Sequence, residues 1–280
     1  MIDKLKQINK NAPVQARASF WFLVCSALQQ GINVIITPIY TRIMSEGQYG
    51  GYGAYTSWYS ILSIIVTLNM GEGVYQRGIV KYEDEKEEFS SSLQSLTLVL
   101  CILWFGVYFI FRNSLNSFLS LTTYQMTGMF VTMWTNAVYI FWMTEQRTQY
   151  RYRAMVAISL SVSAVQAILG ISSVYFFEDK VTARILSFAG VNLVFYIWLF
   201  FSQMFRGKVF FSKRFWAHAL SFCIPLIPHF LSTVILQSSD RIMIQKLAGD
   251  REAGIYTLGS AIALVMSIFN SAISHTMSPW

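Results

Sequence analysis

Charged residues are scarce in this chain of 280 residues. They make up 12% of the sequence, while hydrophobic residues make up 54%; soluble domains carry roughly 25% charged residues. This balance excludes an ordinary soluble domain and predicts a protein with several membrane-spanning segments. The net charge of +7 does not indicate a nucleic-acid partner, because the basic residues lie between apolar runs and form no folded basic domain.

Cysteine is also rare. Each of the three cysteines, Cys25, Cys101 and Cys223, lies inside an apolar run, and no CxxC motif or histidine cluster accompanies them. We therefore expect no disulfide framework, no metal site and no cofactor. The basic N-terminal segment leads into a long apolar run without a small-residue cleavage site, which predicts a retained first span rather than a signal peptide.

Eight apolar runs are long enough to cross a bilayer as helices, which takes about 20 residues. They lie at 18–41, 51–71, 93–112, 119–143, 154–177, 183–205, 219–243 and 253–275. The segments between them are too short for a domain outside the membrane. Irregular backbone cannot face lipid and the alternating strands of a barrel are missing, so we expect an all-α membrane protein with about eight transmembrane helices.

The lysine and arginine residues are distributed unequally between the two sides of these spans. With the N-terminus placed inside, the inner segments hold fourteen of them and the outer segments hold seven. Because such residues favour the cytoplasmic side, the count predicts a multi-pass protein with a cytoplasmic N-terminus.

Polar residues recur at helical spacing inside three spans. They are Ser26, Gln30, Asn33 and Thr37 in the first span, Thr56, Ser60, Ser63 and Thr67 in the second, and His229, Thr233, Gln237 and Asp240 in the seventh. Such stripes serve either helix packing or a water-filled cavity. For the serine and threonine stripe we favour packing. For the other two we favour a cavity, because amide, imidazole and carboxylate groups are costly in hydrocarbon.

Three further features bear on this cavity. Arg77 follows Gly71 and Gly73 at the inner end of the second span, where it faces a cavity mouth or anchors the helix at the interface. Pro225 and Pro228 predict a kink beside His229. Asp240 and Arg241 lie in the membrane if the seventh helix continues past Ser238, and at the interface if it ends there.

The two ends of the chain resemble each other. At a constant offset of 204, Gly50 falls on Gly254 and Tyr52 on Tyr256, and the polar positions of the two hairpins coincide. Parallel repeats of this kind are typical of transporters built from two similar halves. The alternative is that any two membrane hairpins share a Gly-Tyr turn and scattered serines.

Three stretches carry a family resemblance: TPIYTRIMSEGQYGGYGAYTSW, LNMGEGVYQRGIVKYEDEKEEFSSSL and SSDRIMIQKLAGDREAGIYTLGSAI. With them the chain resembles the Wzx-type oligosaccharide flippases, relatives of the MATE drug exporters and the lipid II flippase. The resemblance implies a six-helix lobe at residues 1–214 and the first two helices of a second lobe at 215–280. Because the family has about twelve to fourteen spans, we expect a truncated reading frame or a partial sequence.

The resemblance also implies a function. The family moves a polyprenyl-diphosphate-linked oligosaccharide across the bacterial inner membrane by alternating access, for O-antigen, lipopolysaccharide, capsule or exopolysaccharide synthesis. Its partners would be the bilayer, the lipid-linked substrate, a polysaccharide polymerase and a chain-length regulator. Cationic cavity residues hold the anionic substrate, which suggests Arg241, and then Arg42 and Arg77. By their position, His229 or Asp240 are candidates for coupling transport to a proton or cation.

Other functions remain open at this point. A MATE-like exporter of small molecules would favour a carboxylate in the middle of a span of the first lobe, and none is present there. A membrane polymerase or ligase would carry a large outer loop, whereas the outer loops here are short. No Ser-His-Asp set lies at useful positions, so we expect no enzyme. A nonfunctional remnant is the last alternative.

Overall fold

The computed structural model describes residues 14–71 and 73–277, and within these ranges every regular element is a helix. The long helices are α2 (Val14–Ile43), α3 (Glu46–Thr67), α5 (Lys86–Ile110), α7 (Thr123–Thr148), α8 (Tyr152–Phe176), α9 (Lys180–Gly207), α10 (Lys213–Ala248) and α11 (Asp250–Met277). Two short helices, α4 (Val74–Lys81) and α6 (Arg112–Leu119), and a 3₁₀ turn at Glu83–Glu85 complete the set. Each long helix overlaps a predicted span, which confirms the all-α prediction.

Within the described part of the chain, α2, α5, α8, α9 and α10 are long and apolar enough to cross a membrane. Helices α3 and α7 also overlap predicted spans, but glycine, serine, threonine and tyrosine recur along α3, and threonine recurs along α7 beside glutamine and asparagine. Many residues of both helices are buried against other helices. The polar side chains of these two helices therefore meet protein rather than lipid over much of their length.

Short-range signals fix the helix ends. Ser45 and Gln48 form a reciprocal capping box at the start of α3, and Thr122 and Gln125 form another at the start of α7. Each box satisfies N–H groups that the first turn leaves without a partner. Between α10 and α11 the chain turns at Gly249, whose φ of +103° suits glycine because it has no Cβ.

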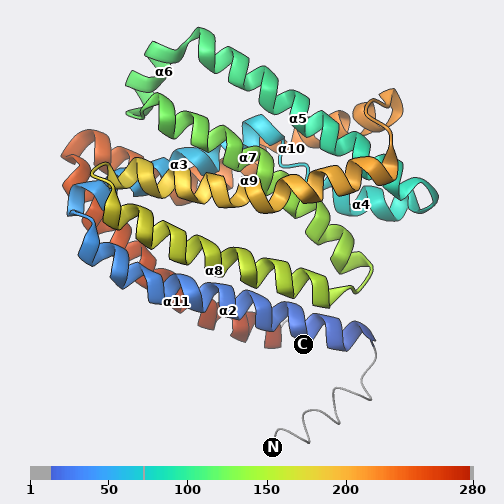
Figure 1. The fold of residues 1–280 in the computed structure, drawn as a ribbon, viewed down its shortest axis with the longest axis horizontal. Coiled ribbons are helices and arrows are strands. Elements are labelled where there is room, and N and C mark those ends of the chain that lie inside the picture. The colour runs from blue at the N-terminus through green and yellow to red at the C-terminus, as the bar shows by residue number, and fades with distance from the viewer. Residues whose placement is uncertain (1–13, 72, 278–280) are drawn as a thin grey trace, which may run out of the picture.

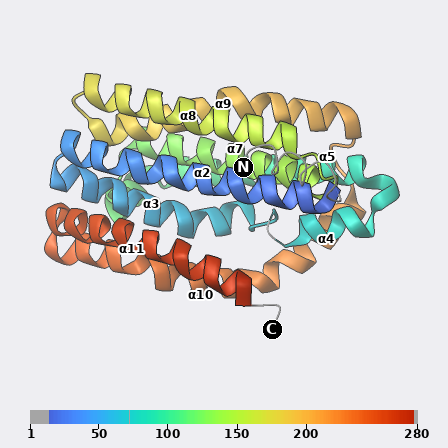
Figure 2. The ribbon, with the colours of Figure 1, turned by 90° about the horizontal axis from the view of Figure 1, so that it is seen from below.

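The helices lie side by side in layers (Figure 2). Helices α8 and α9 form one side, α2, α3 and α7 lie in the middle, and α10 and α11 cover the opposite side. Figure 1 shows α5 and α6 diverging from this group at one edge, while α2 runs along α8 at the other. The first half of α10 is buried against α4 and α5 through Phe215, Ala219 and Cys223, and α11 packs along α3.

Helices α3 and α11 cross in backbone contact at two glycines. A Cβ on Gly50 would collide with the carbonyl oxygen of Asp250, and a Cβ on Gly254 would collide with the carbonyl oxygen of Glu46. The offset of 204 relates Gly50 to Gly254 and also Glu46 to Asp250. Each half of the contact therefore mirrors the other, as two-fold related surfaces do.

Candidate functional site

A hollow of about 690 Å³ lies between α4 and the middle of α10. Its size is within the range of small-molecule sites, which is roughly 300–1,000 Å³. The residues that line it are Gly73, Gln76, Arg77, Val80, Phe222, Leu226, His229 and Phe230. Two residues singled out from the sequence, Arg77 and His229, thus line the same hollow although they are far apart in the chain.

The amphipathic pattern of α4 positions Arg77. Val74, Tyr75, Gly78 and Ile79 of this helix are buried, and the hydroxyl of Tyr75 shares a hydrogen bond of 2.7 Å with Ser90 on α5. These four buried residues lie on one face of the helix. Arg77 lies on the opposite face and points away from the core. The buried face therefore holds the arginine at the rim of the hollow.

The guanidinium carbon of Arg77 lies 5.2 Å from the ring centroid of Phe222 on α10, a cation–π contact that joins the two helices. No carboxylate in residues 14–71 or 73–277 lies within ion-pair distance of Arg77. The planar guanidinium carries five N–H donors, a pattern that fits phosphate oxygens in a bidentate manner. This rim of the hollow can therefore take an anion.

His229 supplies the opposite wall. Its side chain is exposed, and its backbone carbonyl accepts hydrogen bonds from the Ser232 and Thr233 hydroxyls at 2.9 and 3.1 Å. Helix α10 continues through both Pro225 and Pro228, which precede it. The hollow thus combines the permanent positive charge of Arg77 with the imidazole ring of His229. Phenylalanine and leucine side chains lie between them.

Asp240 and Arg241 lie farther along the same helix. Because α10 runs on to Ala248, the interpretation that it ends at Ser238 is wrong. Asp240 accepts a hydrogen bond of 2.8 Å from the Tyr256 hydroxyl on α11. Arg241 is half-buried, and its Nε is buried without a hydrogen bond to a described residue. This second pair belongs to the α10–α11 hairpin and does not line the hollow.

The remaining predicted cavity residues lie elsewhere on the first and seventh spans. The side chains of Gln30, Asn33, Arg42, Thr233 and Gln237 are exposed, and Thr37 is half-buried. The Thr37 hydroxyl donates to the Asn33 carbonyl at 2.8 Å, within its own helix. A shared cavity for these residues stays a prediction.

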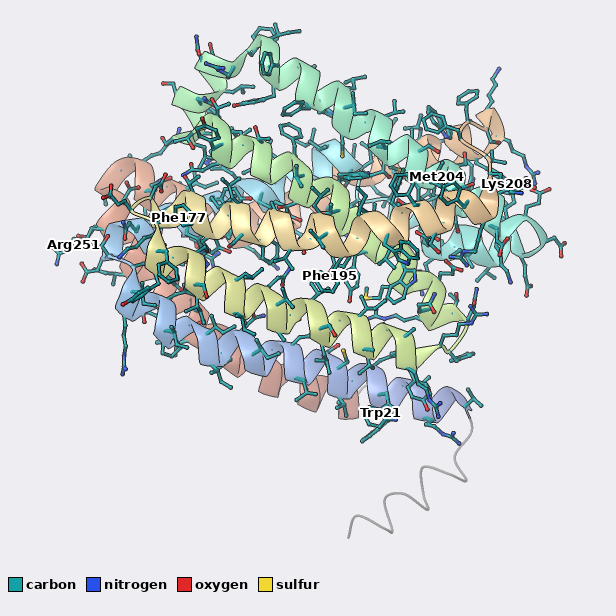
Figure 3. The ribbon with its side chains drawn as sticks, viewed as in Figure 1. Trp21, Phe177, Phe195, Met204, Lys208 and Arg251 are labelled. Carbon is teal, nitrogen blue, oxygen red and sulfur yellow. The ribbon has the colours of Figure 1, made fainter. Side chains whose placement is uncertain are left out.

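The glycine crossing carries an ion pair on its surface. Nε of Arg251 lies 2.6 Å from an oxygen of Glu46, and this hydrogen bond raises the pKa of Arg251. Figure 3 shows Arg251 at one end of the bundle and Lys208 at the other. The crossing of α3 and α11 thus closes the end of the bundle where Arg251 lies.

Comparison with known proteins identifies the family. The profile of the family described as polysaccharide biosynthesis protein matches residues 16–280. The chain belongs to this family. The match confirms the resemblance drawn from the sequence, and with the apolar helices it makes the chain a membrane protein of polysaccharide biosynthesis.

An Lsg locus protein of Haemophilus influenzae is 23% identical to this member of the polysaccharide biosynthesis protein family over 281 residues. The alignment covers 92% of the present chain and 64% of the relative, so the chain spans about two thirds of the relative's length. No solved structure matches the chain.

A buried ion pair joins α7 and α9 in this family member. Glu145 pairs with Arg206 at 2.7 Å and accepts a hydrogen bond of 3.0 Å from Gln203, which in turn accepts one from Gln94 on α5. Glu145 is only 8% exposed at its side chain. The sequence gives no sign of these partners, which lie about 50 to 60 residues away along the chain.

Sequence reasoning also missed the surroundings of Arg184 in α9. Its guanidinium carbon lies 3.6 Å from the ring centroids of both Tyr40 and Tyr52. Nearby, Lys180 donates to the carbonyl of Ile43 at 2.7 Å. Two cations thus tie the start of α9 to α2 and α3. Only the spatial meeting of three helices reveals this, since none of these residues forms a motif in sequence.

Proposed function

We propose that this chain takes part in moving a polyprenyl-diphosphate-linked oligosaccharide across the bacterial cytoplasmic membrane. The observation that supports the proposal is the hollow in which Arg77 and His229 face the same space as Phe222, Leu226 and Phe230. The guanidinium of Arg77 suits a diphosphate, and the apolar side chains suit the first isoprene units next to it. Family membership supports a role in polysaccharide synthesis.

The physical task of such a protein is to carry a sugar head group through about 30 Å of hydrocarbon. Each hydroxyl left without a hydrogen bond there costs several kcal/mol. A protein that offers polar side chains to the head group removes this cost, while the polyprenyl tail stays in lipid. Large apolar side chains such as Phe109, Trp198 and Leu236 are exposed on this chain and suit contact with acyl chains.

In this proposal the N-terminus and α4 lie on the cytoplasmic side, as the distribution of basic residues predicts. The crossing of α3 and α11 then closes the outer side, and the hollow faces the cytoplasm. Residues 1–214 would form one lobe and residues 215–280 the start of a second. Rocking of one lobe against the other would open the glycine crossing and carry the head group outward.

A first prediction tests the hollow directly. Replacing Arg77 with glutamine is expected to weaken binding of a C15 polyprenyl diphosphate about 10- to 100-fold, because a charge-assisted hydrogen bond contributes about 1.5–3 kcal/mol. The dissociation constant is measured with the purified chain in lipid nanodiscs. Lys81→Gln is the matched control, because Lys81 is also an exposed cation of α4 but does not line the hollow.

Lys81→Gln is expected to change binding less than twofold. Equal weakening by both substitutions would mean that α4 attracts the lipid only through its general charge. The same measurement with His229→Gln and Asp240→Asn tests the two residues proposed for ion coupling.

A further inference from the structure

Two partly open cavities follow α3 on the side where it packs against α7. The larger, of about 220 Å³, is lined mainly by Tyr52, Tyr55, Tyr59, Thr132, Asn136 and Phe188. The smaller, of about 60 Å³, extends from Tyr59 and Asn136 past Ser63 and Thr67 to Gly71. Because Tyr59 and Asn136 line both, the two cavities adjoin.

In chain order the two cavities are followed by the hollow that contains Arg77. Gly71 lines the smaller cavity, and Gly73, only two residues later, lines the hollow. The three spaces are thus met in order along α3 and the start of α4. The stretch from Tyr59 to the end of α3 at Thr67 alone spans about 12 Å, so only the outer rings of a saccharide whose anionic group is held at Arg77 extend as far as Tyr59 and Asn136.

The lining of the two cavities suits a neutral ligand rich in hydroxyl groups. None of the residues that line either cavity is charged. Asn136 donates a hydrogen bond of 3.2 Å to the Tyr59 hydroxyl. The proton of Tyr59 and the carbonyl oxygen of Asn136 make no hydrogen bond to a described residue, so one donor and one acceptor remain for a ligand.

The hydroxyl residues add acceptors of the same kind. Thr56 and Thr132 donate to carbonyls of their own helices at 2.7 and 2.8 Å, and so do Ser63 at 3.0 Å and Thr67 at 2.7 Å. With their protons used in this way, their oxygens still offer lone pairs to the cavities. Three members of the serine and threonine stripe of α3, Thr56, Ser63 and Thr67, therefore line the two cavities; the packing function favoured for this stripe from the sequence stays a prediction.

We propose that the larger cavity binds one neutral sugar ring of the lipid-linked saccharide and that the smaller cavity takes a ring substituent or water. The proposal rests on the proposed function, and it adds the class of sugar and the residues that hold it. A space of 220 Å³ corresponds to about seven water molecules at about 30 Å³ each, which one pyranose can replace. The tyrosine rings and Phe188 offer faces to the C–H groups of the sugar, while Asn136 and Tyr59 meet its hydroxyls.

Two lipids separate this proposal from the proposed function. The first is a C15 polyprenyl diphosphate without sugar, and the second is the same lipid with a linear chain of about four uncharged hexoses on the diphosphate, which spans the distance along α3. Both are titrated into the full chain in nanodiscs. We expect the saccharide to tighten binding about tenfold, as two or three additional neutral hydrogen bonds and one aromatic contact would.

Two substitutions in the cavity and one outside it locate the effect. Tyr59→Phe keeps the volume and removes only the hydroxyl, and it is expected to reduce the gain from the saccharide about fivefold. Asn136→Leu is expected to abolish the gain, and neither change affects binding of the plain diphosphate. Tyr108→Phe is the control, because Tyr108 is a buried tyrosine whose hydroxyl donates to Asn116 and which lines neither cavity.

Each outcome decides the proposal. Loss of the gain in Tyr59→Phe and Asn136→Leu, but not in Tyr108→Phe, supports the sugar site. The sugar site is refuted if the wild-type chain binds both lipids equally, or if the gain survives in both cavity variants. In that case the proposed function still stands, provided that binding of the plain diphosphate depends on Arg77. If neither lipid binds, both proposals fall.

Discussion

Replacing Gly254 with alanine is expected to force α3 and α11 apart at their first turns and to lower the free energy of unfolding by about 1–3 kcal/mol. The added Cβ would collide with the backbone carbonyl oxygen of Glu46, and a backbone atom cannot move aside by changing a rotamer. Thermal unfolding of the purified chain in detergent measures the effect as a lower melting temperature.

Gly259→Ala is the matched control, because it lies in the same helix and its Cβ would meet no atom within 4 Å. At this position alanine is expected to raise the free energy of unfolding by up to about 1 kcal/mol, since glycine is the poorer helix former. Gly50→Ala should lower the melting temperature as Gly254→Ala does, because the two halves of the contact mirror each other. Equal melting temperatures for Gly254→Ala and Gly259→Ala would show that the crossing is not tight.

Replacing Glu145 with alanine is expected to lower the free energy of unfolding by about 2–4 kcal/mol. Removing one partner of a buried ion pair costs about 3–5 kcal/mol; the expected loss is somewhat smaller because the Arg206 side chain keeps 35% of its exposure and water can solvate it. Gln203 loses an acceptor at the same time. The packing of α7 against α9 should weaken, and thermal unfolding measures this.

Glu85 offers a control of the same chemistry on the surface. It pairs with Arg214 at 2.9 Å, but the side chains are 43% and 61% exposed. Glu85→Ala is therefore expected to cost at most about 1 kcal/mol, the range of exposed ion pairs. Similar losses for the two alanine variants would show that burial of Glu145 contributes nothing to the stability of the chain.

The positions of the long helices followed from the sequence because hydropathy is a local property of each segment. The start of α5 did not. The prediction began at residue 93, whereas the helix begins at Lys86 and includes the buried, polar Ser91 and Ser95. Their hydroxyls reach the carbonyls of Val209 and Phe210 at 3.1 and 2.6 Å. A serine-rich stretch thus becomes buried helix only because a distant connection satisfies it.

The candidate site was predictable in its parts and not as a whole. Arg77 and His229 were singled out because a cation after two glycines and a titratable group beside two prolines are unusual near a membrane. That they line one hollow depends on the docking of the short helix α4 against α10. The tyrosines and Asn136 of the two cavities along α3 carry no signal in the sequence, since aromatic and amide residues are common in packed membrane helices.

The sequence by itself determined that the chain is helical and that it suits a membrane, because length and apolarity are written along the chain. Only the tertiary structure decided which polar groups meet. Pairs such as Glu145 with Arg206 and Gly50 with Gly254 depend on how the helices rotate and cross. Those choices are set by the packing of the whole helix surface, which no single segment encodes.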